Sequence, residues 1–274
     1  MGTIFAILGY SIVCLVILAI VISTINDKIK EHNDYKKHLN EQKLQNNPDE
    51  NKQKNIHALE HQPRKNDVFQ DYIEKTINGR VLRFYPLPHK YTVDGKPVKT
   101  VTEVVKEWSI DNGFYEYGGV DPKVLMRAAN KGIALHKEIE NFELNGIVGQ
   151  SEEFKNYLKI KKKHQFIPKE NEIFVYICDD EGTPVCAGRL DFTMFLNKQF
   201  GLCDIKRTST YHIHEVELQL NLYRLGYEQL FDAKIETLYC LRLREDVAEF
   251  NKVRLNAKLA KSVVKKYCNQ KTTY

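Results

Sequence analysis

Apolar and polar positions divide the chain of 274 residues into three stretches with different patterns. Residues 4–25 contain no charged side chain and consist mainly of Ile, Val, Leu, Ala and Phe, so the pattern predicts one transmembrane helix within residues 1–25. Residues 26–66 are dense in Lys, Asn, Gln, Glu and His, which is typical of a solvated juxtamembrane linker. From 67 to 274 the apolar positions recur with helix and strand periods, which predicts one folded domain.

Positive charge lies on one side of the apolar stretch only. No Lys or Arg precedes it, whereas Lys28, Lys30, Lys36 and Lys37 follow it. Because basic residues flank membrane helices on the cytoplasmic side, we expect a single-pass protein with its N-terminus outside and its folded domain in the cytoplasm. A cleaved signal peptide is disfavoured, because the stretch has no basic segment before it and no small-residue cleavage site after it.

The folded domain shows both periodicities in an irregular order. Helices, then three strands, a helix and a strand indicate a mixed α/β (α+β) fold with an αβββαβ core rather than a regular βαβ repeat. The pattern predicts helices over 67–77, 103–108, 122–144, 151–164, 211–230 and 255–267, and strands over 80–85, 89–93, 172–178, 185–196, 200–205, 234–243 and 248–253. On the helix 122–144 we expect one inward face formed by Leu125, Ala128, Ala129, Gly132, Leu135, His136, Ile139 and Phe142.

Ionisable residues are concentrated at the end of the predicted hairpin 185–205. Alternate side chains of a strand share a face, so Asp204 and Lys206 point the same way. Pairing of the two strands brings Asp191 alongside Asp204 and places two carboxylates and an ammonium at one end of the sheet. This set suits metal-assisted hydrolysis of a phosphodiester, since hard cations prefer carboxylates, water and phosphate oxygens. The alternative interpretation is an exposed hairpin with an ordinary surface ion pair.

Several motifs around this hairpin occur in a defined order. KGIALHKEIE at 131–140 precedes GRLD at 188–191, DIK at 204–206 and QLNLY at 219–223, and HKYTVDGKPVKTVTEVV stands at 89–105. Together they cover roughly residues 86–231. This ordered set resembles the PD-(D/E)XK nuclease superfamily in its RecB-like and phage-exonuclease-like branch. The resemblance implies a restriction-endonuclease-like core with extra N-terminal helices and a Mg²⁺- or Mn²⁺-dependent nuclease activity.

The resemblance also implies roles for single residues. His136 on its own is more often a satisfied core histidine than a ligand, and only the resemblance favours the second interpretation. Glu172 resembles an acidic position that some members carry before the GxxD strand. The implied metal ligands are Asp191, Asp204, the backbone carbonyl of Ile205, His136 and, at lower weight, Glu172; the implied catalytic and positioning residues are Asp191, Asp204, Lys206, Gln219 and Tyr223.

The formal net charge of +5 is mildly basic and fits a partner that carries phosphates. The alternative is that many of these lysines lie on solvated helix faces. The six cysteines are scattered without a Cys-x-x-Cys pair, so we predict neither a zinc site nor the iron–sulfur cluster of several RecB-like exonucleases. Candidate phosphate contacts are Lys155, Lys159, Lys161, Lys162, Lys163, Arg207 and the lysines of 258–266.

The sequence therefore predicts a membrane-anchored nuclease with DNA as its partner. The competing hypotheses are a tethered nucleic-acid-binding or scaffold protein with the same fold, and a nuclease that acts on RNA. Exonuclease and endonuclease action are equally compatible with these residues. Members of the family include ring-shaped oligomers as well as monomers, so a homo-oligomer is also compatible with the resemblance.

Overall fold

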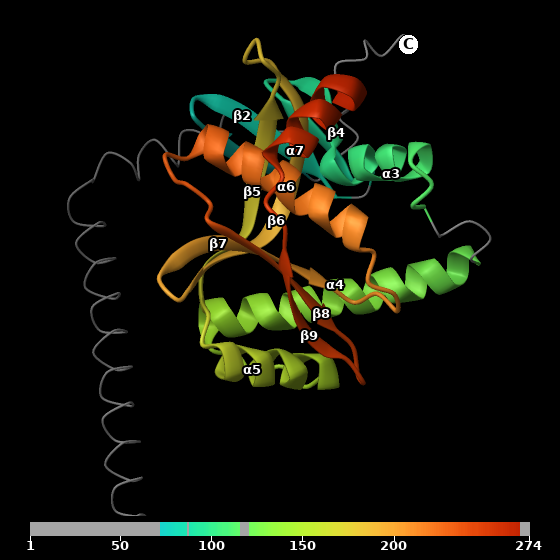
Figure 1. The fold of residues 1–274 in the computed structure, drawn as a ribbon, viewed down its shortest axis with the longest axis vertical. Coiled ribbons are helices and arrows are strands. Elements are labelled where there is room, and N and C mark those ends of the chain that lie inside the picture. The colour runs from blue at the N-terminus through green and yellow to red at the C-terminus, as the bar shows by residue number, and fades with distance from the viewer. Residues whose placement is uncertain (1–71, 87, 116–120, 269–274) are drawn as a thin grey trace, which may run out of the picture. The chain divides into compact units, whose positions relative to one another are not determined.

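The computed structural model describes residues 72–86, 88–115 and 121–268 (Figure 1). These residues form a mixed α+β fold built around a nine-stranded sheet. The predicted membrane span 4–25, the linker 26–66 and the predicted domain boundary at 67 lie outside the described residues. Within the described part of the chain, no helix combines the length and the apolar character needed to cross a bilayer.

Strands and helices alternate in blocks along the described chain. The strands are β1 (Ile73–Ile77), β2 (Arg80–Tyr85), β3 (Lys90–Val93), β4 (Lys96–Thr100), β5 (Ile167–Cys178), β6 (Pro184–Leu196), β7 (Gln199–Lys206), β8 (Thr237–Leu243) and β9 (Ala248–Val253). The helices are α3 (Val101–Asp111), α4 (Pro122–Asn145), α5 (Glu152–His164), α6 (Ile213–Leu230) and α7 (Ala257–Val263), which continues into a π-helical turn, η1 (Val264–Cys268).

The first four strands form an antiparallel meander. Its outer hairpins turn at Asn78-Gly79 and Asp94-Gly95, where all four residues have positive φ angles between 49° and 76°. Such turns match the right-handed twist of paired strands, and Asn-Gly and Asp-Gly are their preferred sequences. The helix predicted over 67–77 is therefore wrong for residues 73–77, which form β1 and pair with β2.

The remaining strands follow the predicted order. β5, β6 and β7 are an antiparallel meander, α6 crosses over the sheet, and β8 returns parallel to β7 before β9 pairs with it. Helix boundaries are set by local capping. Thr100 and Glu103 form a capping box at the start of α3, and Gly146 ends α4 in the left-handed conformation.

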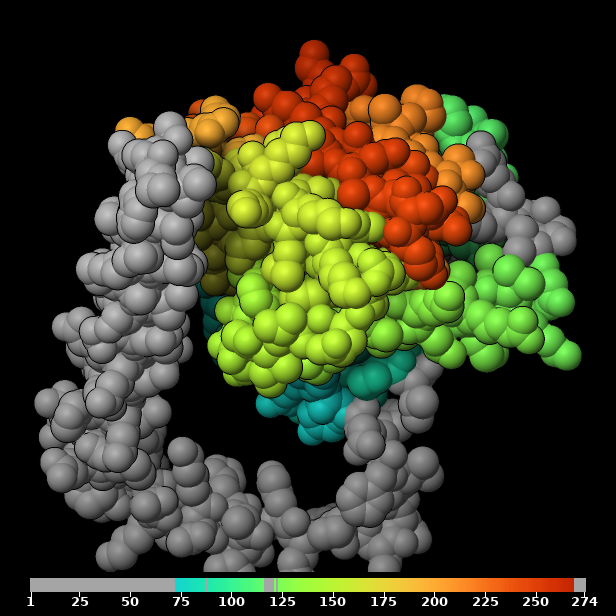
Figure 2. Space-filling model, turned by 90° about the horizontal axis from the view of Figure 1, so that it is seen from below, coloured from blue at the N-terminus to red at the C-terminus, as the bar shows by residue number. Residues whose placement is uncertain are grey.

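The sheet has a hydrophobic core on each face. One core packs β-strand side chains against α3, α6 and α7, and the other packs them against α4 and α5. Figure 2 shows this side of the molecule, where the N-terminal half of α4 projects beyond α5. The predicted inward face of α4 is wrong in that half, because Leu125, Ala128 and Ala129 are exposed and the buried residues begin at Leu135.

Candidate metal and catalytic site

The site lies where one edge of β6 changes partners. β5 pairs along the first edge of β6, whereas the second edge is shared. β4 pairs there with Cys186 and Ala187, and β7 pairs there with residues 192–196. The GRLD segment, residues 188–191, therefore lies between the two pairings. Side chains from both faces of the sheet reach this split.

Asp191 and His136 meet at the split. The register of β6 with β7 continues toward Asp204, and the Ile205 N–H donates to Asp191 Oδ2 over 2.5 Å. His136 on α4 brings Nδ1 within 3.2 Å of Asp191 Oδ1 and Nε2 within 3.2 Å of the Ile205 carbonyl oxygen. Burial lowers the pKa of His136, but the charge of Asp191 outweighs this effect and raises it to about 9. Burial raises the pKa of Asp191, yet His136 holds it below its usual value.

Glu172 enters the site through the register of β5 with β6. It lies between the pairs Asn171↔Phe192 and Ile173↔Leu190, which places it opposite Asp191, and it has a left-handed φ of 53°. Directly opposed residues of an antiparallel pair have neighbouring side chains, and a carboxylate oxygen of Glu172 lies within 4.8 Å of one of Asp191. Glu172 Oε2 lies 2.6 Å from Arg189 Nε, and burial raises the pKa of Glu172. Glu172 does not open its strand, as the sequence suggested, but lies within it.

Asp204 and Lys206 form an ion pair beside this group, with Nζ 2.7 Å from Asp204 Oδ2. Burial raises the pKa of Asp204 to about 6. Lys206 lowers this pKa, but repulsion from Asp191 raises it and so offsets part of the effect of Lys206. Burial lowers the pKa of Lys206, but the two carboxylates raise it above its usual value. Apart from the ion pair, the buried Oδ2 of Asp204 accepts no hydrogen bond from the described residues.

Helix α6 covers the split from the other face. Tyr223 lies so close to β6 that a Cβ at Gly188 would be 2.8 Å from its ring. The glycine of GRLD therefore permits this approach. Gln219, one turn earlier, donates to the Tyr223 hydroxyl over 3.4 Å and lines the same cavity as Lys206.

Three of these residues form a cluster that could hold a metal ion. One ligand atom each of His136, Glu172 and Asp191 lies within 4.8 Å of the others. Carboxylate oxygens are ligands for hard cations, and the imidazole becomes a nitrogen donor once it loses the proton that Asp191 stabilises. Glu172, the residue with the weakest sequence support, belongs to this cluster. Asp204 does not belong to it, and its carboxylate pairs with Lys206.

All the sequence-derived site residues converge on one region, and further residues join them. A central cavity of about 190 Å³ is lined by every predicted site residue except Ile205, whose backbone carbonyl is bound by His136. Arg189 and Thr102, to which the sequence assigned no role in the site, are among the other residues that line it. Arg189 was detectable, because it stands two positions before Asp191 in the same strand. Thr102 carries no comparable signal.

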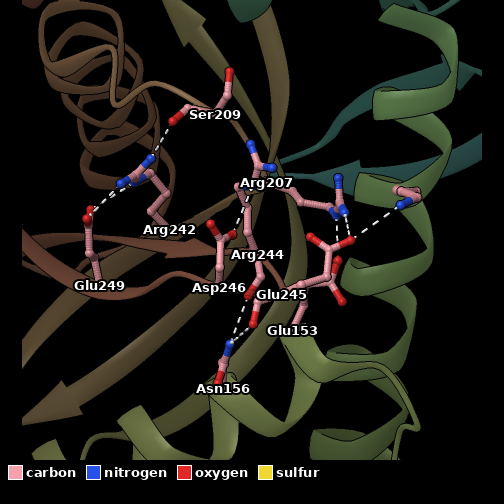
Figure 3. Close-up of polar contacts among 10 residues, drawn as sticks. Glu153, Asn156, Arg207, Ser209, Arg242, Arg244, Glu245, Asp246 and Glu249 are labelled. Carbon is pink, nitrogen blue, oxygen red and sulfur yellow. Dashed lines mark hydrogen bonds and ion pairs between the residues drawn. The ribbon is translucent and has the colours of Figure 1, made fainter. Parts of the chain in front are cut away.

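Arg207 was expected to contact phosphate, and the structure corrects this. Its side chain is only 9% exposed, with Nε 2.7 Å from Glu153 and one terminal nitrogen 2.5 Å from Glu245 (Figure 3). Glu245 also pairs with Lys131, and Asn156 donates to the backbone carbonyl of Glu245. Arg207 therefore ties the end of β7 to α5 and to the β8–β9 turn.

Two further cavities adjoin the central one. A cavity of about 770 Å³ opens along α4, and another of about 330 Å³ lies between α3 and α6. Thr102 and Lys206 line all three, so the three cavities flank the lysine. We call these three cavities the groove, and the carboxylates of Asp191 and Asp204 line the central one.

Comparisons with known proteins give little beyond this geometry. No protein-family model matches the chain, and no curated protein matches it. Among solved structures, the chain is similar to the crystal structure of a protein designated SSO0001, with 17% sequence identity and a TM-score of 0.33. That match covers 62% of this chain and 82% of the other. A likeness this slight carries no argument about function.

Proposed function

We propose that the described domain is a nuclease of the PD-(D/E)XK superfamily that hydrolyses phosphodiester bonds of DNA with Mg²⁺ or Mn²⁺. One observation carries the proposal: the His136, Glu172 and Asp191 cluster shares a cavity with Lys206 at the split edge of β6. The order α4, α5, β5, β6, β7, α6, β8 supports a restriction-endonuclease-like αβββαβ core.

Three side chains are the proposed metal ligands. Asp191, Glu172 and His136 would hold the cation, with the Ile205 carbonyl beside them. The cation would supply charge stabilisation for the phosphoryl group. The nitrogen donor of His136 favours Mn²⁺ over Mg²⁺, since Mg²⁺ prefers oxygen ligands.

Lys206 acts as a cation in this proposal. Asp204 and Asp191 raise its pKa, so its ammonium group does not serve as a general base at neutral pH. It can orient the attacking water and stabilise negative charge on the phosphate oxygens. Asp204 holds this ammonium in place through the 2.7 Å ion pair.

Two alternatives compete with a DNA nuclease. A binding-only protein needs phosphate contacts, but it has no chemical need for buried carboxylates that crowd a lysine. RNA offers the same phosphodiester group, so the substrate assay must include it. We also propose, from the apolar pattern alone, that residues 4–25 anchor this nuclease to a membrane with its catalytic domain in the cytoplasm.

The test is a cleavage assay on the purified full-length chain in detergent. Linear, circular and single-stranded DNA and RNA would be incubated with Mg²⁺, Mn²⁺ or EDTA. We expect metal-dependent cleavage that Asp204→Ala abolishes, and cleavage of the circle would identify endonuclease action. Metal-independent binding without cleavage, equal in both proteins, would favour the binding-only alternative. Cleavage of RNA alone would reassign the substrate.

A further inference from the structure

The cavity between α3 and α6 differs in character from the metal cavity beside it. Its volume of about 330 Å³ falls in the range of pockets that hold small ligands. It shares Thr102, Lys206 and Gln219 with the metal cavity, so a ligand there would touch the proposed catalytic lysine. It therefore flanks the position where a phosphate would be cleaved.

The lining of this cavity offers apolar and aromatic walls to a flat ring, beside the basic groups of Lys106, Lys206 and His212 that suit the attached phosphate. Val105 and Val216 contribute apolar surface, and Tyr115 contributes an aromatic ring with Lys106 Nζ 5.5 Å from its centroid. Glu215 contributes a carboxylate, which repels phosphate but accepts hydrogen bonds from N–H groups. Aromatic and apolar walls with a few polar groups are how proteins hold nucleobases outside a helix.

We propose that this cavity binds the nucleobase next to the cleaved phosphate in an unpaired state. A base stacked and paired in a duplex cannot enter a cavity between two helices, so the substrate at the cleaved position is single-stranded or locally unpaired. This inference rests on the proposed nuclease function and adds the class of substrate to it. Val105, Val216 and Tyr115 would hold the ring, and Glu215 would accept from its edge.

The first experiment uses the unmodified full-length chain and a set of single-stranded oligonucleotides. Each carries one abasic residue at a different position around a single cleavage site, and cleavage is measured in Mn²⁺. Loss of one base–aromatic contact weakens binding about tenfold or more. We expect one adjacent abasic position to lower kcat/KM by at least that factor, with little effect several residues away. Cleavage that does not depend on the abasic position would overturn the base pocket while leaving the nuclease proposal intact.

The second experiment measures binding without cleavage. Fluorescence anisotropy in EDTA would compare the intact strand with every strand of the abasic set on the full-length chain, on Val105→Trp and on Ile110→Trp. Val105→Trp fills the cavity, whereas Ile110 is exposed on the same helix and serves as the matched control. We expect the unmodified chain and Ile110→Trp to bind the intact strand more tightly than one of the abasic strands, and Val105→Trp to bind these two strands equally.

The binding experiment tests the base pocket independently of cleavage. Equal affinity of the intact strand and every abasic strand for the unmodified chain, or no binding at all, would overturn the pocket even if cleavage fails on every substrate. The comparison within the unmodified chain does not depend on whether Val105→Trp folds. If no substrate is cleaved but the intact strand binds about tenfold more tightly than one of the abasic strands, the base pocket stands and the nuclease proposal fails.

Discussion

Lys206 and Arg207 are neighbours in sequence, yet they belong to two charge clusters of different construction. Lys206 points into the groove, where its side chain is 25% exposed and its partner Asp204 is crowded by Asp191. Arg207 is 9% exposed and bridges Glu153 and Glu245 in a closed network (Figure 3). One cluster is open to a ligand, and the other joins secondary-structure elements.

The difference shows what marks a functional cluster in this fold. Both clusters contain buried charged side chains joined by ion pairs, so these features alone do not separate them. The site cluster differs because burial and repulsion from Asp191 raise the pKa of Asp204, because the two carboxylates raise the pKa of Lys206, and because a cavity gives access. Four predictions test this contrast, beginning with the largest expected effect.

Arg207→Met tests the closed network. Removal of the guanidinium leaves Glu153 buried without its partner, and the loss of a buried partner costs about 3–5 kcal/mol. We expect urea denaturation to show this loss in the free energy of unfolding, with part of it recovered in Arg207→Met/Glu153→Gln. Arg254→Met is the control, because Arg254 is itself 72% exposed and its partner Glu217 keeps a hydrogen bond from Asn256, so this substitution should cost about 1 kcal/mol or less. A stable Arg207→Met that no longer binds DNA would instead place Arg207 on the substrate.

Lys206→Met tests the open cluster. Loss of one electrostatic group that stabilises developing charge lowers kcat by about 10²–10³-fold. We expect cleavage to fall by that factor while binding of DNA in EDTA stays within a few-fold and circular dichroism remains unchanged. Lys198→Met, on the exposed β6–β7 turn, is the control and should cleave at the parental rate. Parental activity in Lys206→Met would refute the assignment of the lysine.

Metal binding should distinguish carboxylates of the two clusters. A ligand at 100 times its Kd that binds only the folded state stabilises it by about 2.7 kcal/mol. We expect Mn²⁺ to stabilise the parental chain and Glu245→Gln against unfolding, because Glu245 belongs to the closed network. Asp191→Asn should lose the stabilisation by Mn²⁺. An equal response to Mn²⁺ in Asp191→Asn would exclude this cluster as the metal site.

Local patterns predicted the fold well where the signal was itself local. The hairpin of β6 and β7 and its alignment of Asp191 with Asp204 follow from strand periodicity and a polar turn. The error at β1 was avoidable from the local sequence, because Asn78-Gly79 is a strong hairpin signal that outweighs the helical spacing before it. The exposure of the N-terminal half of α4 was not predictable from the local sequence, since burial of this helix depends on where the sheet ends.

The partners of charged residues were not predictable in the same way. Arg207 follows Lys206 directly and looks equally suited to phosphate, but its partners Glu153 and Glu245 stand 54 and 38 positions away. Glu172 reaches the metal cluster because the register of β5 with β6 places it opposite Asp191, and no local residue pattern fixes that register. The sequence pointed to residues that the fold brings to one cavity, whereas the proposed division into ligands and supports depends on long-range packing.

Glu172 offers the smallest and most discriminating test, because it joins backbone strain to the proposed ligand set. Its left-handed φ of 53° disfavours any residue with a Cβ by roughly 1–2 kcal/mol, and glycine escapes this cost. Glu172→Ala and Glu172→Gly both remove the carboxylate, so we expect both to weaken Mn²⁺ binding while the Gly variant unfolds at higher urea. At Lys252, an exposed position of β9 with ordinary φ, the order should reverse and Gly should be less stable than Ala by about 0.5–1 kcal/mol. If Ala is the more stable variant at both positions, the left-handed conformation of Glu172 is not the native one. Mn²⁺ binding that is unchanged in both Glu172 variants would remove Glu172 from the proposed metal ligands.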